Sequence, residues 1–255
     1  RQIEHRGPDD EGFVIFSNNI ATRCRGKNTD KEFCDQIFLT DIKSAEIVLG
    51  HHRLNIIDLT PAGHQPYHYN GMWLIYNGEI YNYLELKDIL IKKGYVFQTK
   101  TDTEVLIKAW NEWAENSLIH FNGMWSFVLY DSNSRRIFLS RDRFGEKPLY
   151  YSLCNNNFIF ASETKFFKNL IDLSLNEAKV HDYLSKCLVD HDEETFFSGI
   201  NQVPSGQLLE LEIDSLKIIR RHKYWSIPSS TLKINNFDDA VDELDRKSTR
   251  LNSSH

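Results

Sequence analysis

Short apolar runs separated by polar turn residues dominate the first two-thirds of this 255-residue chain. The runs are rich in Ile, Val, Phe, Tyr and Trp, which are common in β-strands, and turn residues bound most of them. We predict strands at residues 12–16, 46–49, 53–57, 72–76, 125–130, 136–140, 149–151 and 157–161. Residues 131–134 (DSNS) are typical of a tight turn, so the strands on either side should form a hairpin.

Two segments between these strands have the apolar spacing of amphipathic helices. The first spans residues 83–93 and ends before Gly94, a residue type that commonly follows a helix. The second spans residues 101–113. One face of it carries Val105, Leu106, Ala109 and Trp110. Because helices are few and grouped, we predict an α+β fold of antiparallel sheets layered with helices rather than a doubly wound parallel sheet.

The pattern changes near residue 174, where a helical segment follows at 175–188. Later elements are strands at 194–200, 207–213 and 218–221, turns at 204–206 and 214–215, and a helix at 237–244. We therefore divide the chain into a first region at residues 1–173 and a second at 174–246. Residues 247–255 are polar and aperiodic, and we interpret them as a non-native tail.

Composition and charge argue against several classes of protein. The formal net charge is −6 and the basic residues are scattered, so neither a nucleic-acid partner nor an anionic membrane is expected. No run approaches the ~18 apolar residues of a membrane span, and no secretory signal opens the chain. The four cysteines, Cys24, Cys34, Cys154 and Cys187, are far apart, so we expect no disulfide framework and a cytoplasmic location.

Asn77 and Gly78 stand where the strand predicted at 72–76 gives way to the helix predicted at 83–93. The asparagine amide and the unhindered glycine N–H could both point into a cleft. Donors of this kind stabilise the charge that develops on a tetrahedral intermediate. Taken alone, however, the dipeptide is more typical of a simple Asn-Gly turn.

Charged residues elsewhere could match the two ends of an amino acid. Arg53 lies in a predicted strand and could hold a carboxylate with its forked guanidinium, or it could be an ordinary surface arginine. Thr101 and Glu104 match a capping box at the start of a helix. Asp102 beside them is either one more first-turn anion or, together with Glu79, a partner for an ammonium group.

No nucleophile is evident in the sequence. It contains no glycine-rich phosphate loop, no HExxH, no GxSxG and no evident Ser-His-Asp arrangement, and no cysteine has a convincing base beside it. His51 and His52 are adjacent strand residues that should face opposite sides, and no further ligands are grouped with them. We therefore expect no metal site.

Several short segments follow one another along the chain in the order in which a known family carries its motifs. They are HRGPD at 5–9, GHHRLNI at 50–56, NGEIYN at 77–82, TDTE at 101–104, SRDRFGEKPLYY at 140–151 and ASETK at 161–165. Together they resemble the glutaminase half of glutamine-hydrolysing asparagine synthase, a class II glutamine amidotransferase. The resemblance extends over nearly the whole chain up to residue 244.

This resemblance implies both a fold and a site. The family has the N-terminal-nucleophile hydrolase fold, a four-layer sandwich with two antiparallel sheets between helices. By resemblance, Arg53 would bind the α-carboxylate of glutamine, and Glu79 and Asp102 would bind its α-ammonium. Asn77 and Gly78 would form the oxyanion hole. Backbone groups of further residues would line the pocket: Leu54, Asn55, Ile56 and Ile57.

The resemblance also implies two features that we do not find in this sequence: a nucleophilic cysteine and a synthetase domain. The family's nucleophile is an N-terminal cysteine whose α-amino group acts as the base, and it precedes the HRGPD segment. We therefore expect that cysteine upstream of Arg1 and no glutamine hydrolysis by these residues alone. No cofactor is expected here, whereas ATP and Mg²⁺ are implied for a separate synthetase domain that amidates aspartate. The family often forms homodimers.

The sequence is also compatible with two other functions. The acceptor could be another carboxylate, for example on a sugar or a peptide, because its recognition belongs to the synthetase domain. The chain could also be a non-catalytic glutamine-binding domain, which would require a natural N-terminus without cysteine.

Overall fold

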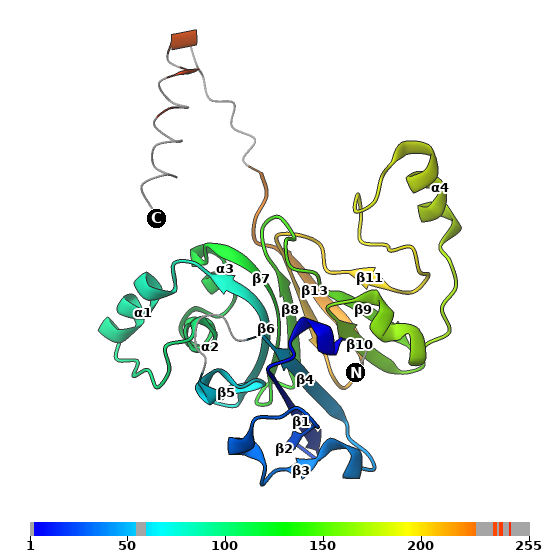
Figure 1. Ribbon diagram of the computed structural model, residues 1–255. Coiled ribbons are helices and arrows are strands. Elements are labelled where there is room, and N and C mark those ends of the chain that lie inside the picture. The colour runs from blue at the N-terminus through cyan, green and yellow to red at the C-terminus, as the bar shows by residue number, and fades with distance from the viewer. Residues whose placement is uncertain (1–2, 55–59, 228–236, 239, 242–244, 246–255) are drawn as a thin grey trace. The chain divides into compact units, whose positions relative to one another are not determined.

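The computed structural model describes residues 3–54, 60–227, 237–238, 240–241 and 245 (Figure 1). Residues 1–225 form one compact unit, and residues 226–255 form a second. In the second unit the described residues from 237 onward are helical. This agrees with the helix predicted at 237–244, the other residues of which lie outside the described part.

A six-stranded antiparallel sheet forms the centre of the first unit, in the order β13-β12-β8-β7-β6-β5. Its strands are β5 (Tyr67–Tyr69), β6 (Met72–Ile80), β7 (Gly123–Asp131), β8 (Arg136–Arg141), β12 (Gln207–Glu212) and β13 (Lys217–Lys223). The hairpin predicted at 131–134 and the turn predicted at 214–215 are confirmed, because they join β7 to β8 and β12 to β13. Side chains alternate between the two faces of the sheet, and each face contributes to its own apolar core.

Three helices cover one face of this sheet: α1 (Tyr83–Lys92), α2 (Asp102–Trp113) and α3 (Ser117–His120) (Figure 1). Leu74 and Leu129 from the sheet are fully buried in one core with Leu90 of α1 and Val105 of α2. Burying a side chain of this size contributes about 1.5–3 kcal/mol. The apolar faces predicted for the two longer helices therefore attach them to the sheet.

Local signals determine where these helices begin and end. α1 is followed by Gly94, whose φ of +97° is a conformation that favours glycine after a helix. Thr101 caps α2, because its hydroxyl accepts a hydrogen bond from the Glu104 N–H at 3.3 Å. The Glu104 carboxylate departs from the predicted capping box and accepts from the backbone N–H groups of Gln98 and Thr99.

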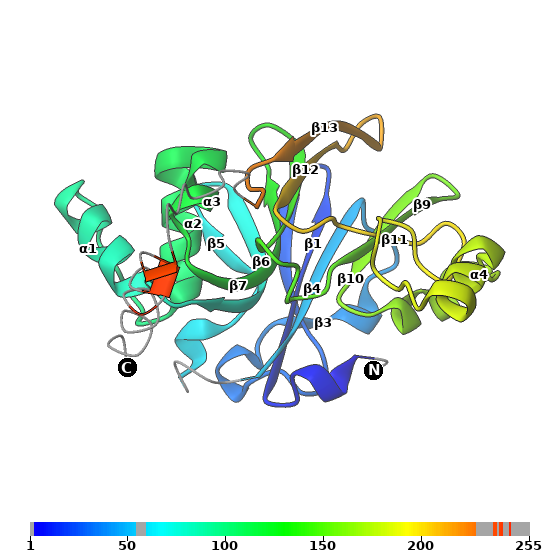
Figure 2. The ribbon, with the colours of Figure 1, turned by 90° about the horizontal axis from the view of Figure 1, so that it is seen from above.

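Two smaller sheets pack against the other face of the central sheet (Figure 2). The order β3-β2-β1-β4 joins β1 (Asp10–Ser17), β2 (Ile20–Arg25), β3 (Ile37–Phe38) and β4 (Ile47–Arg53). The order β10-β9-β11 joins β9 (Tyr150–Cys154), β10 (Asn157–Ala161) and β11 (Asn201–Gln202). Leu49 of β4 and Tyr151 of β9 share a core with Val128 of β7. The predicted α+β class is confirmed, with the second sheet layer divided in two and a parallel β2–β3 pair.

Shorter elements lie beyond the divided layer. A third, smaller core joins Ala161 of β10 to Phe167 in the 3-10 helix η6 (Thr164–Asn169). The helix predicted at 175–188 is α4 (Glu177–Lys186). The strand predicted at 194–200 is wrong, because this segment makes only isolated bridges. Within the described residues, no helix combines the length and the apolar character needed to cross a bilayer.

Two strands run further than their apolar runs predicted. β6 continues past Tyr76 to Ile80, because its last residues pair with the beginning of β7. β4 is a single strand across the predicted gap at 50–52, since those residues pair with β1. The strand predicted at 53–57 therefore contributes only Arg53 to β4, and residues 55–57 lie outside the described part.

Candidate functional site

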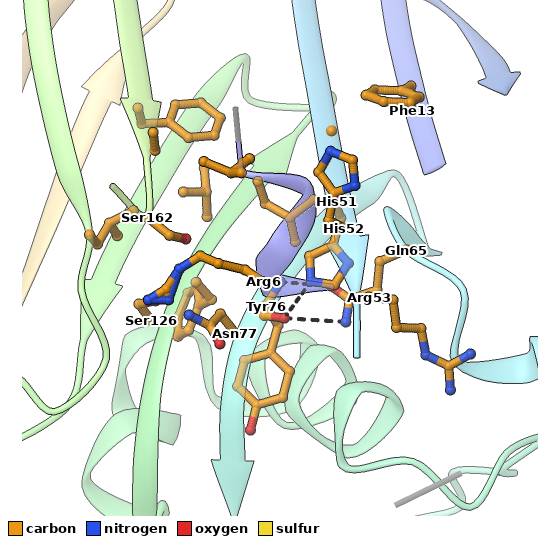
Figure 3. A pocket seen from close by; sticks show the side chains of 18 of the residues that line it. Arg6, Phe13, His51, His52, Arg53, Gln65, Tyr76, Asn77, Ser126 and Ser162 are labelled. Atoms are coloured by element: carbon orange, nitrogen blue, oxygen red, sulfur yellow. Dashed lines mark hydrogen bonds between the residues drawn. The ribbon is translucent and has the colours of Figure 1, made fainter. Parts of the chain in front are cut away.

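Six of the predicted site residues line one cavity of about 1040 Å³ (Figure 3). They are Arg53, Leu54, Asn77, Gly78, Glu79 and Asp102. The other three predicted residues, Asn55, Ile56 and Ile57, lie outside the described part of the chain. The walls come from β4, β6, β7 and β10 and from the start of α2, so the fold gathers distant parts of the sequence around one space.

Asn77 and Gly78 lie within the paired part of β6, opposite Ser126 and Trp125 of β7. The alternative of a simple Asn-Gly turn is therefore wrong. Gly78 has no room for a side chain, because a Cβ there would lie 2.2 Å from the carbonyl oxygen of Met124. Both residues are half-buried, and Figure 3 shows Asn77 beside Ser126. The pair can offer donors to a molecule in the cavity.

Arg53 is the last residue of β4 and is 7% exposed. Its Nη1 donates to the carbonyl oxygen of Thr60 at 2.8 Å. Gly63 leaves room for the guanidinium, because a Cβ at that position would lie 2.1 Å from Nη2 of Arg53. In Figure 3 the arginine side chain points away from Asn77. The Arg53 guanidinium and the Asn77–Gly78 donors therefore lie at different parts of one cavity.

Asp102 is the first residue of α2 and is almost fully buried. Its Oδ2 accepts hydrogen bonds from the Tyr76 hydroxyl at 2.8 Å and from the Ile80 N–H at 3.0 Å. Burial raises the pKa of the Asp102 carboxyl above its usual value, although these hydrogen bonds act in the opposite direction. Glu79 lies on β6 next to Ile80 and is half-buried. The Glu79 carboxylate thus belongs to β6, and the Asp102 carboxylate is hydrogen-bonded to that strand.

Sequence reasoning missed two side chains that hold the backbone just before Asn77. Gln65 Oε1 accepts from the Tyr76 N–H at 2.7 Å, and Gln65 Nε2 donates to the Tyr76 carbonyl oxygen at 3.3 Å. His51 Nε2 lies 3.0 Å from the same oxygen (Figure 3). These contacts join residues 11 and 25 positions apart, and no local motif signals them.

A sequence family described as a glutamine amidotransferase domain matches residues 35–225. The chain belongs to this family. A Methanocaldococcus jannaschii protein, provisionally named asparagine synthetase 2 (glutamine-hydrolyzing), is 34% identical over 89% of this chain. Asparagine synthetase 1 (glutamine-hydrolyzing) of Bacillus subtilis is 32% identical over 81% of it. The chain covers 42% and 31% of these two proteins and so spans less than half of their length.

The fold of this amidotransferase domain has solved counterparts. Glutamine phosphoribosylpyrophosphate amidotransferase from B. subtilis matches with a TM-score of 0.61 and 19% identity, over 89% of this chain and 45% of that one. At that identity the likeness concerns the fold alone. It confirms the predicted fold of antiparallel sheets layered with helices.

Two segments that contributed to the family resemblance meet beside the cavity of the amidotransferase domain. Arg6, in the 3-10 helix η1 (Glu4–Arg6), lines the cavity and has its Nε 2.7 Å from Glu163 Oε1. Glu163 also lies 2.9 Å from His5 Nε2 and 2.8 Å from Lys165 Nζ. The HRGPD and ASETK segments are therefore joined by one shared carboxylate.

Other reactive side chains lie elsewhere in the amidotransferase domain. All four cysteines are free thiols; Cys24 is buried, Cys34 and Cys187 are exposed, and none of the four lines the cavity. In the part of the chain that the structure describes, no three His, Cys, Asp or Glu residues are grouped as they would be to hold a metal ion.

His51 is expected to make the stability of the domain pH-dependent. Burial lowers the pKa of His51 to about 4, whereas an unfolded histidine titrates near 6.5. Between these values the unfolded state binds the extra proton, so the free energy of unfolding should decrease as the pH falls. The contribution of His51 amounts to about 3 kcal/mol over this range. Urea denaturation at several pH values measures it.

The matched variant is His51→Gln, which keeps an N–H donor within reach of Tyr76 but does not titrate. Its stability should fall less steeply than that of the wild type from pH 6.5 to 4. His52→Gln, on the same strand, is measured beside it, because burial also lowers the pKa of His52 and the two substitutions separate the contributions of the two histidines. Identical pH profiles for His51→Gln and the wild type would show that His51 is not the group responsible.

Proposed function

We propose that the cavity binds L-glutamine by both of its ends. Arg53 holds the α-carboxylate, Glu79 and Asp102 hold the α-ammonium, and Asn77 and Gly78 face the side-chain carbonyl. The observation that carries this proposal is that the Arg53 guanidinium, the Glu79 and Asp102 carboxylates and the Asn77–Gly78 donors line a single cavity. This set complements a zwitterion with a reactive amide. The membership of the amidotransferase family supports the same substrate.

We propose further that the parent protein transfers the glutamine nitrogen to aspartate. Relatives named asparagine synthetase support this acceptor, and they are more than twice as long as the matched region. A second domain of the same protein would bind ATP and Mg²⁺ and activate the aspartate. The free cysteines, two of them exposed, fit a reducing cytoplasm.

A second candidate is amide transfer to a different carboxylate. A relative from Gibberella zeae named amidase chry2 is 29% identical over 88% of this chain. The glutamine site would be the same in both cases, and the acceptor would be chosen outside the matched region. Assaying the full-length protein with ATP and either aspartate or other carboxylates separates the two candidates.

We also propose that these 255 residues bind glutamine without hydrolysing it. The family uses a cysteine as its nucleophile, and neither Cys24 nor any other cysteine of the chain lines the cavity. An ammonia-release assay with L-glutamine tests this directly. Ammonia production above the rate without protein, and its loss in a Cys24→Ser or Cys154→Ser variant, would overturn the proposal.

Calorimetric titration with L-glutamine tests the binding function itself. We expect saturable binding of L-glutamine with a Kd of about 1 mM or tighter, the range in which enzymes usually bind substrates. D-Glutamine presents the same groups in the wrong arrangement and should bind at least about 10-fold more weakly. Absence of saturable heat with L-glutamine, or equal binding of the two enantiomers, would contradict the proposed site.

The chain offers a matched pair of glutamates for this titration. Glu79 lines the cavity, whereas Glu85 is exposed on α1 outside it. Glu79→Gln should weaken L-glutamine binding by about 10-fold, because a charge-assisted hydrogen bond to the ammonium group becomes neutral. Glu85→Gln should leave the affinity unchanged. Equal effects of the two substitutions would remove Glu79 from the site.

A further inference from the structure

The central sheet has an incomplete edge beside the donor pair. β5 pairs with β6 only from Tyr67, opposite Leu74, to Tyr69, opposite Met72. β6 nevertheless continues to Ile80. If the β5–β6 register is extended by two residues, Gln65 stands opposite Tyr76. The structure places Gln65 there, but its side chain rather than its backbone makes the contacts.

The Gln65 carboxamide makes the pair of hydrogen bonds that a neighbouring strand would make. Its Oε1 accepts from the Tyr76 N–H at 2.7 Å, and its Nε2 donates to the Tyr76 carbonyl oxygen at 3.3 Å. Gln65 is 6% exposed, so these bonds are shielded from water. His51 Nε2, 3.0 Å from the same oxygen, gives that carbonyl a second partner from β4.

The Tyr76 carbonyl belongs to the peptide plane that leads into Asn77. Two side chains hold this oxygen, and a peptide plane cannot rotate about its own C–N bond. The Asn77 backbone is therefore held on both sides, by its pairing with Ser126 of β7 and by Gln65 and His51 on the side away from β7. The Asn77 Cα, from which both the Asn77 side chain and the peptide that carries the Gly78 N–H continue, is attached to this anchored plane.

We propose that Gln65 is a positioning residue for the amide end of the bound glutamine. Its carboxamide replaces the missing part of β5 and aligns the Asn77–Gly78 donors with the side-chain carbonyl of the substrate. This inference rests on the proposed glutamine-binding function. It assigns Gln65 to one end of the ligand only. Arg53 donates to the Thr60 carbonyl oxygen, and Asp102 accepts from the Tyr76 hydroxyl and the Ile80 N–H. Among the described residues, by contrast, the Gln65 side chain bonds only the backbone of Tyr76.

The experiment compares two ligands that share their α-groups. L-Glutamine has a side-chain carbonyl, whereas L-norvaline has a similar length and none. In the Gln65→Met variant, which retains bulk but not the two hydrogen bonds, the affinity for L-glutamine should fall about 10-fold. The affinity for L-norvaline should change less than about 2-fold. Calorimetry, or competition for the weaker ligand, gives both values.

Gln202→Met is the matched control. Gln202 is 4% exposed, its Oε1 accepts from Arg141, and its Nε2 donates to the carbonyl oxygen of Asp192. It does not line the glutamine cavity. The substitution therefore removes an equally buried carboxamide, and it should affect stability without changing the affinity for either ligand.

Each result has a separate meaning. Wild-type protein that binds neither ligand refutes the proposed function. Wild-type binding together with an equal loss of both ligands in Gln65→Met, or no loss of either, refutes the positioning role alone. If Gln65→Met does not fold, Gln65→Glu serves instead, because it keeps the acceptor for the Tyr76 N–H and loses the donor to its carbonyl. The same selective loss of L-glutamine binding is expected, and an unselective result overturns the inference.

Discussion

Replacing Arg53 with alanine is expected to weaken L-glutamine binding by at least about 100-fold, or about 2.7 kcal/mol. A buried guanidinium that holds a carboxylate contributes two charge-assisted hydrogen bonds, and truncation leaves the ligand's charge unpaired in the cavity. Arg53→Lys keeps the charge but not the forked geometry, so we expect an intermediate loss of about 10-fold. Calorimetric titration measures both effects.

Arg23 provides the control for this prediction. It lies on β2, stacks over Trp73 with its guanidinium carbon 5.0 Å from the ring centroid, and does not line the cavity. Arg23→Ala should bind L-glutamine as the wild type does. Because Arg53 is buried, circular dichroism must first show that Arg53→Ala is folded. A folded Arg53→Ala variant with wild-type affinity would refute the assigned role of Arg53.

The largest loss of stability is expected from Lys108→Met. Lys108 and Glu104 form an ion pair at 2.5 Å within α2, with side chains 4% and 1% exposed. The Glu104 carboxylate also accepts from the N–H groups of Gln98 and Thr99. Removing the lysine leaves a buried carboxylate without its cation, which should cost about 3–5 kcal/mol. The midpoint of urea denaturation reports the loss.

A second lysine shows whether burial is the cause. Lys93 pairs with Glu112 at 2.7 Å, but these side chains are 44% and 26% exposed. Lys93→Met should cost no more than about 1 kcal/mol, because water screens and replaces the interaction. The double variant Glu104→Gln with Lys108→Met should recover part of the stability lost in Lys108→Met. Similar costs for Lys93→Met and Lys108→Met would contradict this explanation.

The sequence predicted the elements that depend on short-range signals. The helix before Gly94, the helix capped by Thr101 and the hairpin at 131–134 all correspond to the structure, because residues close in sequence form their turns and caps. It failed where distant pairing decides the outcome. Tyr76 to Glu79 resembled the end of a strand, yet pairing with β7 carries β6 through these polar residues.

Residue type and family resemblance predicted which residues would be grouped together, but not which side chains hold them in place. Arg53, Glu79 and Asp102 stood out as charges in marked positions, and the structure brings all three to one cavity. The roles assigned to them stay predictions. Gln65 and His51 carried no such signal, because an uncharged amide and a neutral imidazole become informative only when their partner, the Tyr76 backbone, is known.

The use of a side chain to complete the edge of β6 has a consequence for how this domain could diversify. A β-strand that completes the edge of a sheet consists of many residues, and changing it also disturbs the strand with which it pairs. A single carboxamide can be exchanged by one mutation while the sheet stays intact. The alignment of the Asn77–Gly78 donors with the amide of the ligand could thus change during evolution without a change in the fold.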